Sequence, residues 1–106
     1  SLSGQSALGS AVRTGEKLKS ATVMREILMA QILAKNETGK WPAKLPEGVS
    51  HANPWTDSDP GYEWVPPANN VQGDAKTVVL YQLKDGKRVA GAPTGRADGS
   101  VREPNE

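Results

Sequence analysis

The stretch from residue 6 to residue 37 contains no proline, and this feature constrains the fold more than any other in the chain. Most of its residues are good helix formers, and apolar side chains recur in it at spacings of three and four. One apolar stripe on such a helix holds Leu18, Ala21, Met24, Leu28 and Ile32, and a second holds Val23, Ile27, Ala30 and Ala34. The sequence therefore predicts a long helix over residues 1–38, with a broader apolar surface than one small sheet requires.

The two ends of this helix carry different signals. Gly4, Gly9 and Gly15 each weaken a helix by roughly 0.5 to 1 kcal/mol relative to alanine, so we expect the first turns to fray unless a neighbour holds them. At the other end Gly39 can adopt the left-handed conformation that stops a helix. The well-determined part is predicted to start near Thr14 and to end before residue 39.

The rest of the chain has the pattern of a small antiparallel sheet. Residues 39–60 are rich in proline and polar residues, which indicates a loop that crosses the surface. Alternating and β-branched residues predict an edge strand at 62–65, a central strand at 77–83 and a partner strand at 88–90. The fold class is α+β: one domain in which the long helix packs on a three- to four-stranded sheet over residues 61–101.

Two Asp-Gly pairs mark tight turns in this sheet. Asp85 and Gly86 lie between two predicted strands, where positive φ angles favour a hairpin. Asp98 and Gly99 predict a second turn that leads into the valine at position 101. Residues 102–106 are expected to form a loose tail.

Charge and composition exclude several function classes. The chain of 106 residues has 13 basic and 12 acidic residues, interspersed, which creates no field that attracts nucleic acid. It has no cysteine, so neither a disulfide framework nor a cysteine-based zinc site can form. No window is apolar enough over about 18 residues to span a membrane. Because the first residue is serine, an upstream membrane segment is compatible with this sequence.

The sequence offers little for catalysis. His51 is the single histidine, and it lies in a polar loop without the strand-to-helix context of a nucleophile elbow. No phosphate-binding glycine loop is present. The chain is therefore interpreted as not an enzyme, with no catalytic residues. A small hydrolase that depends on His51 is one alternative hypothesis. Full activity of a His51→Ala variant would exclude it.

The aromatic residues support an alternative function. Because the chain has no phenylalanine, we expect Trp41, Trp64 and Tyr81 to pack in the core. The role of Trp55 stays open. The second hypothesis is a secreted or periplasmic ligand-binding domain, which would use exposed aromatic residues at Trp55, Tyr62 and Trp64.

The carboxylates of the loops have two interpretations. Asp57 and Asp59 alternate on a flexible loop, as calcium ligands can, but calcium takes six to eight oxygen atoms. The remaining ligands would have to come from backbone carbonyls, from Asp98 in the later turn, or from Asp74. In the other interpretation these aspartates start turns by accepting hydrogen bonds from nearby backbone amides.

The order of several motifs resembles a known family. A helix that ends in Asn-Glu-Thr-Gly-Lys-Trp-Pro (36–42) is followed by a Pro-rich crossing and the strand Val-Val-Leu-Tyr (78–81). Ala-Asp-Gly-Ser-Val (97–101) comes late in the chain. This order, which covers most of the chain, resembles the periplasmic domain of type II secretion-type pseudopilins. Members usually place an apolar strand before the Ala-Asp-Gly turn, whereas this chain has Pro-Thr-Gly-Arg at 93–96.

The resemblance implies a structural subunit of a filament. Family members carry a leader and an apolar helix upstream that anchors them in the inner membrane, so the chain is expected on the periplasmic side of the bacterial inner membrane, with its single-pass anchor absent here. The implied partners are other pseudopilin subunits and the secretion machinery. The family also implies calcium in the C-terminal loops, for which Asp57, Asp59 and Asp98 are the candidates; no other cofactor is expected. The residues assigned to the assembly helix are Leu18, Val23, Met24, Ile27, Leu28 and Ile32. The same apolar surface also fits a helix wrapped by its own loops.

Overall fold

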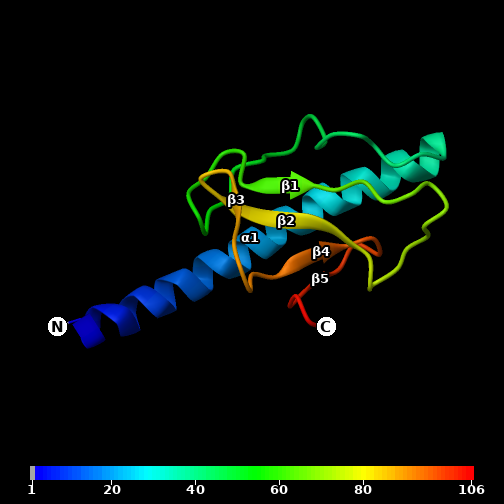
Figure 1. The fold of residues 1–106 in the computed structure, drawn as a ribbon. Helices are drawn as coiled ribbons and strands as arrows, with labels where there is room; N and C mark the ends of the chain where they lie inside the picture. Colours follow the sequence, from blue (N-terminus) through cyan, green and yellow to red (C-terminus); the bar gives the residue numbers. More distant parts are fainter. Residues whose placement is uncertain (1) are drawn as a thin grey trace.

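The computed structural model describes residues 2–106, with side chains from Thr14 onward. The chain forms one helix, α1 (Leu2–Thr38), followed by five short strands. The strands are β1 (Tyr62–Trp64), β2 (Val78–Lys84), β3 (Lys87–Arg88), β4 (Thr94–Arg96) and β5 (Val101–Arg102). Figure 1 shows α1 lying along one face of the sheet and continuing beyond it at its N-terminal end. The molecule is accordingly elongated, with extents of 54 × 28 × 20 Å.

The sheet is antiparallel throughout, which confirms the α+β class, although it has more strands than the sequence predicts. β1 forms one edge and pairs with β2 from Tyr62 opposite Gln82 to Trp64 opposite Leu80. On the other edge of β2, β3 pairs near its C-terminal end and β4 near its start. β5 pairs with β4 and completes the sheet. β2 is thus the central strand and β1 an edge strand, as the sequence predicts.

β4 forms where the sequence departs from the pseudopilin pattern. Thr94–Arg96 is buried and pairs with both β2 and β5, although it has no apolar pattern. Gly95 explains why this segment fits, because a Cβ atom there would lie 2.8 Å from Leu80 Cβ and 3.0 Å from Leu28 Cδ1. The absence of a side chain at Gly95 lets Leu28 of α1 and Leu80 of β2 lie close to the backbone of β4.

The core lies between α1 and the sheet. Met24, Ile27 and Leu28 of the helix are almost fully buried against Val79 and Leu80 of β2. The cluster is completed by Trp41, Tyr62, Trp64 and Ala97. The helix therefore covers one face of the sheet and supplies three of the nine buried residues of the core cluster.

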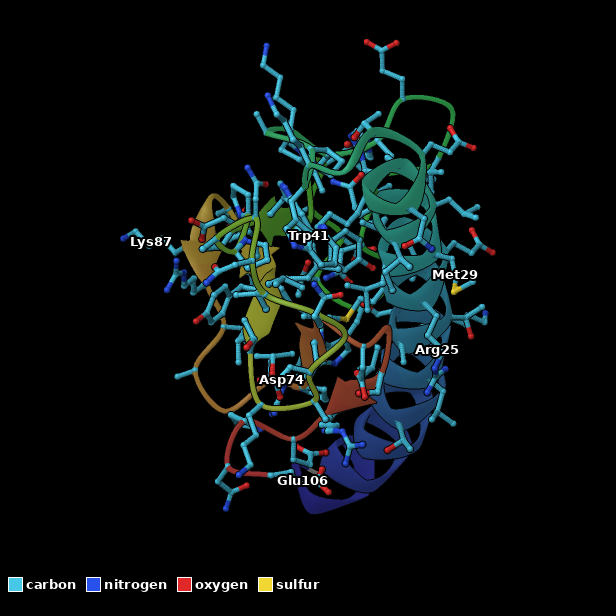
Figure 2. All side chains as sticks on the ribbon, turned by 90° about the vertical axis from the view of Figure 1, so that its right-hand side faces the viewer. Arg25, Met29, Trp41, Asp74, Lys87 and Glu106 are labelled. Carbon is cyan, nitrogen blue, oxygen red and sulfur yellow. The ribbon has the colours of Figure 1, made fainter. Side chains whose placement is uncertain are left out.

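The end of α1 follows its sequence signals. Gly39 has a φ angle of 80° and donates its N–H to the carbonyl of Lys35 at 2.8 Å, which closes the helix. Trp41 then folds back between helix and sheet (Figure 2), with its ring centroid 6.1 Å from that of Trp64. Its Nε1–H donates to the carbonyl of Val71 at 3.2 Å. Trp41 and Trp64 are buried, as expected.

The hairpin between β2 and β3 also matches its signal. Asp85 and Gly86 have φ angles of 51° and 80°, so both central residues adopt the left-handed conformation that a two-residue hairpin requires. The turn at Asp98 is present too, and its Gly99 has a φ angle of 89°. These turns set the register of the strands that flank them.

The C-terminal segment is held by a buried arginine, where the sequence predicts a loose tail. Arg96 is almost fully buried, and its guanidinium donates to Thr94 Oγ1 and to the carbonyl of Ala75. It also donates to the carbonyls of Glu103 and Glu106, at 2.6 and 3.0 Å. Four oxygen acceptors thus satisfy the buried charge and fix the last residues against β4.

The side chains of residues 2–13, and with them the expectation that the turns around Gly4 and Gly9 need a neighbour, lie outside the described residues. No helix within the described part of the chain is long and apolar enough to cross a membrane.

Candidate assembly surface

A buried polar network fixes the rotation of α1 on the sheet. The hydroxyl of Ser20 donates to Gln82 Oε1 at 2.5 Å and lies 2.8 Å from the hydroxyl of Tyr62. Asn53 Nδ2 donates to the same Gln82 oxygen at 3.1 Å, and Gln82 Nε2 donates to the carbonyl of Pro93. Because each of these groups is buried and paired, turning the helix about its axis would break several hydrogen bonds.

Tyr62 is held neutral within this network. Burial raises the pKa of the Tyr62 hydroxyl to about 12, although its hydrogen bond with Ser20 opposes part of the shift. The phenol therefore stays protonated across the physiological range, and its part in the network is structural.

The network and the core together define an inner face of α1. It consists of Ser20, Met24, Ile27, Leu28 and Gln31, all of them buried. At its far end Gln31 Nε2 donates to the carbonyl of Lys44 at 2.8 Å, so the loop after the helix is attached to the same face. This face makes the contacts that the fold requires of the helix.

The opposite side of α1 carries a row of exposed residues, which we call the outer stripe. It consists of Leu18, Thr22, Met29 and Leu33. The three large apolar side chains among them, Leu18, Met29 and Leu33, are 66, 54 and 55% exposed. Figure 2 shows Arg25 and Met29 directed away from the sheet.

The structure distributes the predicted assembly residues over both faces. Met24, Ile27 and Leu28 lie in the core beneath the sheet, and Val23 and Ile32 pack partly buried against that core. Leu18 is exposed, so it alone of the six predicted residues belongs to the outer stripe.

Met29 and Leu33 are missing from the predicted set. Their spacing contained the signal: Leu18 and Met29 are eleven residues apart, which is about three turns of a helix, and Leu33 follows one turn later. All three therefore lie on one side of α1, almost opposite Ile27 and Gln31. The face that meets the sheet could not be identified from the sequence alone, because both sides of the helix are apolar.

Arg25 and Glu26 border the outer stripe. Both side chains are exposed, and within the described residues neither has an ion pair or hydrogen bond. Because consecutive residues of a helix are about 100° apart, they lie on opposite flanks of the stripe. The stripe is thus an apolar seam with a free positive charge on one flank and a free negative charge on the other.

The aromatic residues do not form an exposed platform. Tyr62 and Trp64 are buried, so of the three proposed ligand-binding aromatics only Trp55 is partly exposed, with Lys17 Nζ 5.7 Å from its ring centroid. Tyr81 is not a core residue, contrary to expectation. Its side chain is only partly buried, and the guanidinium of Arg88 lies 3.8 Å from its ring centroid.

Arg88 contacts both Tyr81 of β2 and Glu63 of β1. Its Nε donates to Glu63 Oε1 at 2.7 Å, and its Nη2 donates to Glu63 Oε2 at 3.2 Å. These hydrogen bonds lower the pKa of Glu63. Tyr81 lies opposite Glu63 in the pairing of β1 and β2, so this register places its side chain beside the ion pair.

The three candidate calcium ligands lie in two different segments, Asp98 in the turn before β5 and the other two in the loop before β1. Asp98 Oδ1 accepts hydrogen bonds from the N–H and hydroxyl of Ser100, which lower the pKa of Asp98, and Arg102 lies 4.0 Å away. Asp57 and Asp59 are exposed in the loop before β1. Among the described residues, no group of three histidine, cysteine or acidic side chains is arranged to hold a metal ion.

His51 is fixed by its own loop. Its Nε2 atom lies 2.6 Å from the carbonyl oxygen of Pro46, and the ring is partly buried. The described contacts bring no carboxylate or hydroxyl to its ring, so the structure gives it no partner for catalysis.

Comparisons with known proteins leave the family open. Neither protein-family models, nor curated proteins, nor solved structures yield a match to this chain.

Proposed function

We propose that this chain is a non-catalytic structural subunit of a type II secretion-like pseudopilus or a related filament, which assembles through its N-terminal helix. The observation that carries the proposal is the length of α1 relative to the sheet. The helix runs from Leu2 to Thr38 and continues past a sheet that covers only its C-terminal part (Figure 1). A helix that projects from a small domain offers a surface for neighbouring subunits.

The setting follows from the same proposal. An anchor helix upstream of Ser1 would hold the domain on the periplasmic side of the bacterial inner membrane, and the partners would be other pseudopilin subunits and the secretion machinery. The α+β fold and the order of helix, crossing loop and sheet support this assignment. The outer stripe supports it as well, because an exposed row of large apolar side chains is typical of an interaction surface.

The first experiment concerns the gene. We expect the coding sequence upstream of Ser1 to contain a leader and an apolar segment of about 20 residues, long enough to cross the inner membrane. A start codon directly before Ser1 would contradict the proposal.

The second experiment tests assembly of the full-length product in cells. Residues 1–106 contain no cysteine, so a Ser10→Cys variant adds one thiol to them, in the N-terminal part of α1. Oxidation of membranes should crosslink neighbouring subunits through this thiol. Lys87→Cys, in β3, is the matched control, since Figure 2 places Lys87 on the side of the molecule away from the helix. Equal crosslinking of both variants would show random collision rather than assembly through α1.

A further inference from the structure

The outer stripe is accessible to a second helix. The inner face of α1 is fully occupied by the sheet and by the polar network, and the outer stripe lies on the opposite side of the same helix. A partner helix at the usual distance of about 8 to 10 Å would approach the stripe from the side opposite the inner face, and at Leu18 and Arg25 it would lie beside the hollow that these residues line with Val101 and Arg102 of β5. The seam offers Leu18, Met29 and Leu33 at its centre, with Thr22 between them.

The flanking charges favour one relative direction of the two helices in a symmetric pair. In a two-fold pair of parallel helices, the left flank of one helix faces the right flank of the other, so Arg25 of each copy faces Glu26 of its partner. In a two-fold antiparallel pair each flank faces its own copy, so Arg25 meets Arg25 and Glu26 meets Glu26. Opposite charges attract and like charges repel across such a seam, which favours the parallel arrangement.

We propose that the outer stripe binds a second copy of this chain, with the two α1 helices parallel and in register. Leu18, Met29 and Leu33 of one copy meet the same residues of the other, and two reciprocal Arg25–Glu26 pairs border this apolar seam. The inference deepens the proposed function by naming the face of α1 and the residues that meet, and it rests on that function for the setting in which copies meet.

The size of the seam predicts a weak contact for the isolated domain. Three partly exposed apolar side chains offer on the order of a few hundred Å². A stable interface buries about 800 Å² on each partner. The pair therefore forms only transiently in dilute solution, and it becomes populated when an array or a membrane raises the effective concentration of the chains. A covalent trap is the suitable assay.

Single-cysteine variants of the folded chain measure the contact directly. Leu18→Cys and Leu33→Cys are each expected to form a disulfide-linked dimer under mild oxidation, at a yield about tenfold above that of Lys87→Cys. In a mixture of the two, intact mass should find the two homodimers in excess over the mixed dimer. Leu18 and Leu33 are about 22 Å apart along the helix, so an antiparallel pair cannot bring both residues close to their own counterparts.

Each other outcome of the mixture overturns the proposal. A predominant mixed dimer would show an antiparallel pair. Yields equal to that of Lys87→Cys would show collision alone. All three substituted positions are exposed, and a thermal melt by circular dichroism verifies that each variant folds before its yield is compared.

Charge reversal tests the flanks without changing the seam. In the Leu33→Cys background, Arg25→Glu or Glu26→Arg should lower the dimer yield about tenfold, because each replaces two attractive pairs by two repulsive ones. The double variant with both changes restores reciprocal pairs and should return the yield to about that of Leu33→Cys. A double variant as defective as the single ones would overturn the charge argument.

The inference and the proposed function can fail separately. If the Ser10→Cys subunit crosslinks in membranes while Leu18→Cys and Leu33→Cys do not exceed the control, the chain assembles through α1 by another face, and the inference is wrong alone. If the purified domain forms the parallel homodimers but no anchor is encoded upstream of Ser1, the contact stands and the filament assignment falls.

Discussion

The inner face and the outer stripe of α1 each carry three large apolar side chains, yet the chain covers only the first set. Met24, Ile27 and Leu28 are buried against the sheet, whereas Leu18, Met29 and Leu33 are more than half exposed. The polar residues differ in the same way: Ser20 and Gln31 are buried and hydrogen-bonded, while Arg25 and Glu26 have no partner within the described part of the chain.

This difference separates what the fold needs from what it leaves free. The inner face explains why α1 is attached to the sheet in one orientation, because its apolar and polar contacts all require that rotation. The outer stripe makes no such contact, so its leucines and methionine favour the fold through their helix propensity and not through packing against the sheet. The proposed contact with a second copy would give these exposed apolar residues a role.

The largest effect should come from the inner face. Leu28→Ala should lower the free energy of unfolding by about 2 to 5 kcal/mol, because it opens a cavity between α1 and β4. Urea denaturation monitored by tryptophan fluorescence measures the loss. An equally small loss for Leu28→Ala and for a substitution in the outer stripe would remove the distinction between the two faces.

Alkaline pH should weaken the inner face through Tyr62. Its folded pKa of about 12 lies above its ordinary value of 10.0, so the unfolded chain loses this proton first as pH rises. The contribution of the neutral phenol to the free energy of unfolding is therefore complete below pH 10. Between about pH 10 and 12 this contribution falls by roughly 2 to 3 kcal/mol. The measurement is urea denaturation across this range.

The Tyr62→Phe variant isolates that contribution from other groups that titrate. It lacks the phenol proton, so its stability should fall less steeply with pH than that of the unchanged chain. At neutral pH it should be less stable by about 1 kcal/mol, because the hydroxyl of Ser20 loses a hydrogen-bond partner. Parallel pH profiles of the two proteins would contradict the raised pKa.

A smaller effect is expected where the inner face meets β4. Gly95→Ala places a Cβ atom 2.8 Å from Leu80 Cβ and 3.0 Å from a methyl group of Leu28. The Leu28 side chain can shift, but the Cβ of Leu80 cannot move without its strand, so we expect a loss of about 1 to 2 kcal/mol. Thermal unfolding measures this loss of stability. Gly86→Ser is not a suitable control, because Gly86 has a positive φ angle and the substitution would itself strain the backbone.

Local patterns predicted the helix, the hairpin and the central strand. The spacing of apolar residues identified α1, the Asp-Gly pair identified the turn after β2, and Gly39 identified the helix end. Each of these features depends on residues that are close together in the sequence, so the sequence alone is enough to predict it.

Features that depend on distant partners were not predictable. Arg96 is buried because oxygen atoms from positions 75, 94, 103 and 106 accept hydrogen bonds from its guanidinium. No local sequence pattern predicts this burial. Tyr81 faces outward because the pairing with β1 sets the side of the sheet on which each residue of β2 lies. The outer stripe was missed for the same reason, since the position of the sheet decides which side of α1 is inside.

The smallest effect on stability should come from the outer stripe, and its sign is informative. Leu33→Ala removes an exposed side chain and introduces the best helix former, so we expect the free energy of unfolding to change by less than about 0.5 kcal/mol, or to rise slightly. The same leucine-to-alanine change at position 28 removes identical atoms from the core, which makes the two variants a matched pair in urea denaturation. A loss above about 1 kcal/mol at Leu33 would mean that the stripe already has a partner within the folded chain. Such a stripe would not be free to bind a second copy, because docking would then have to displace that contact.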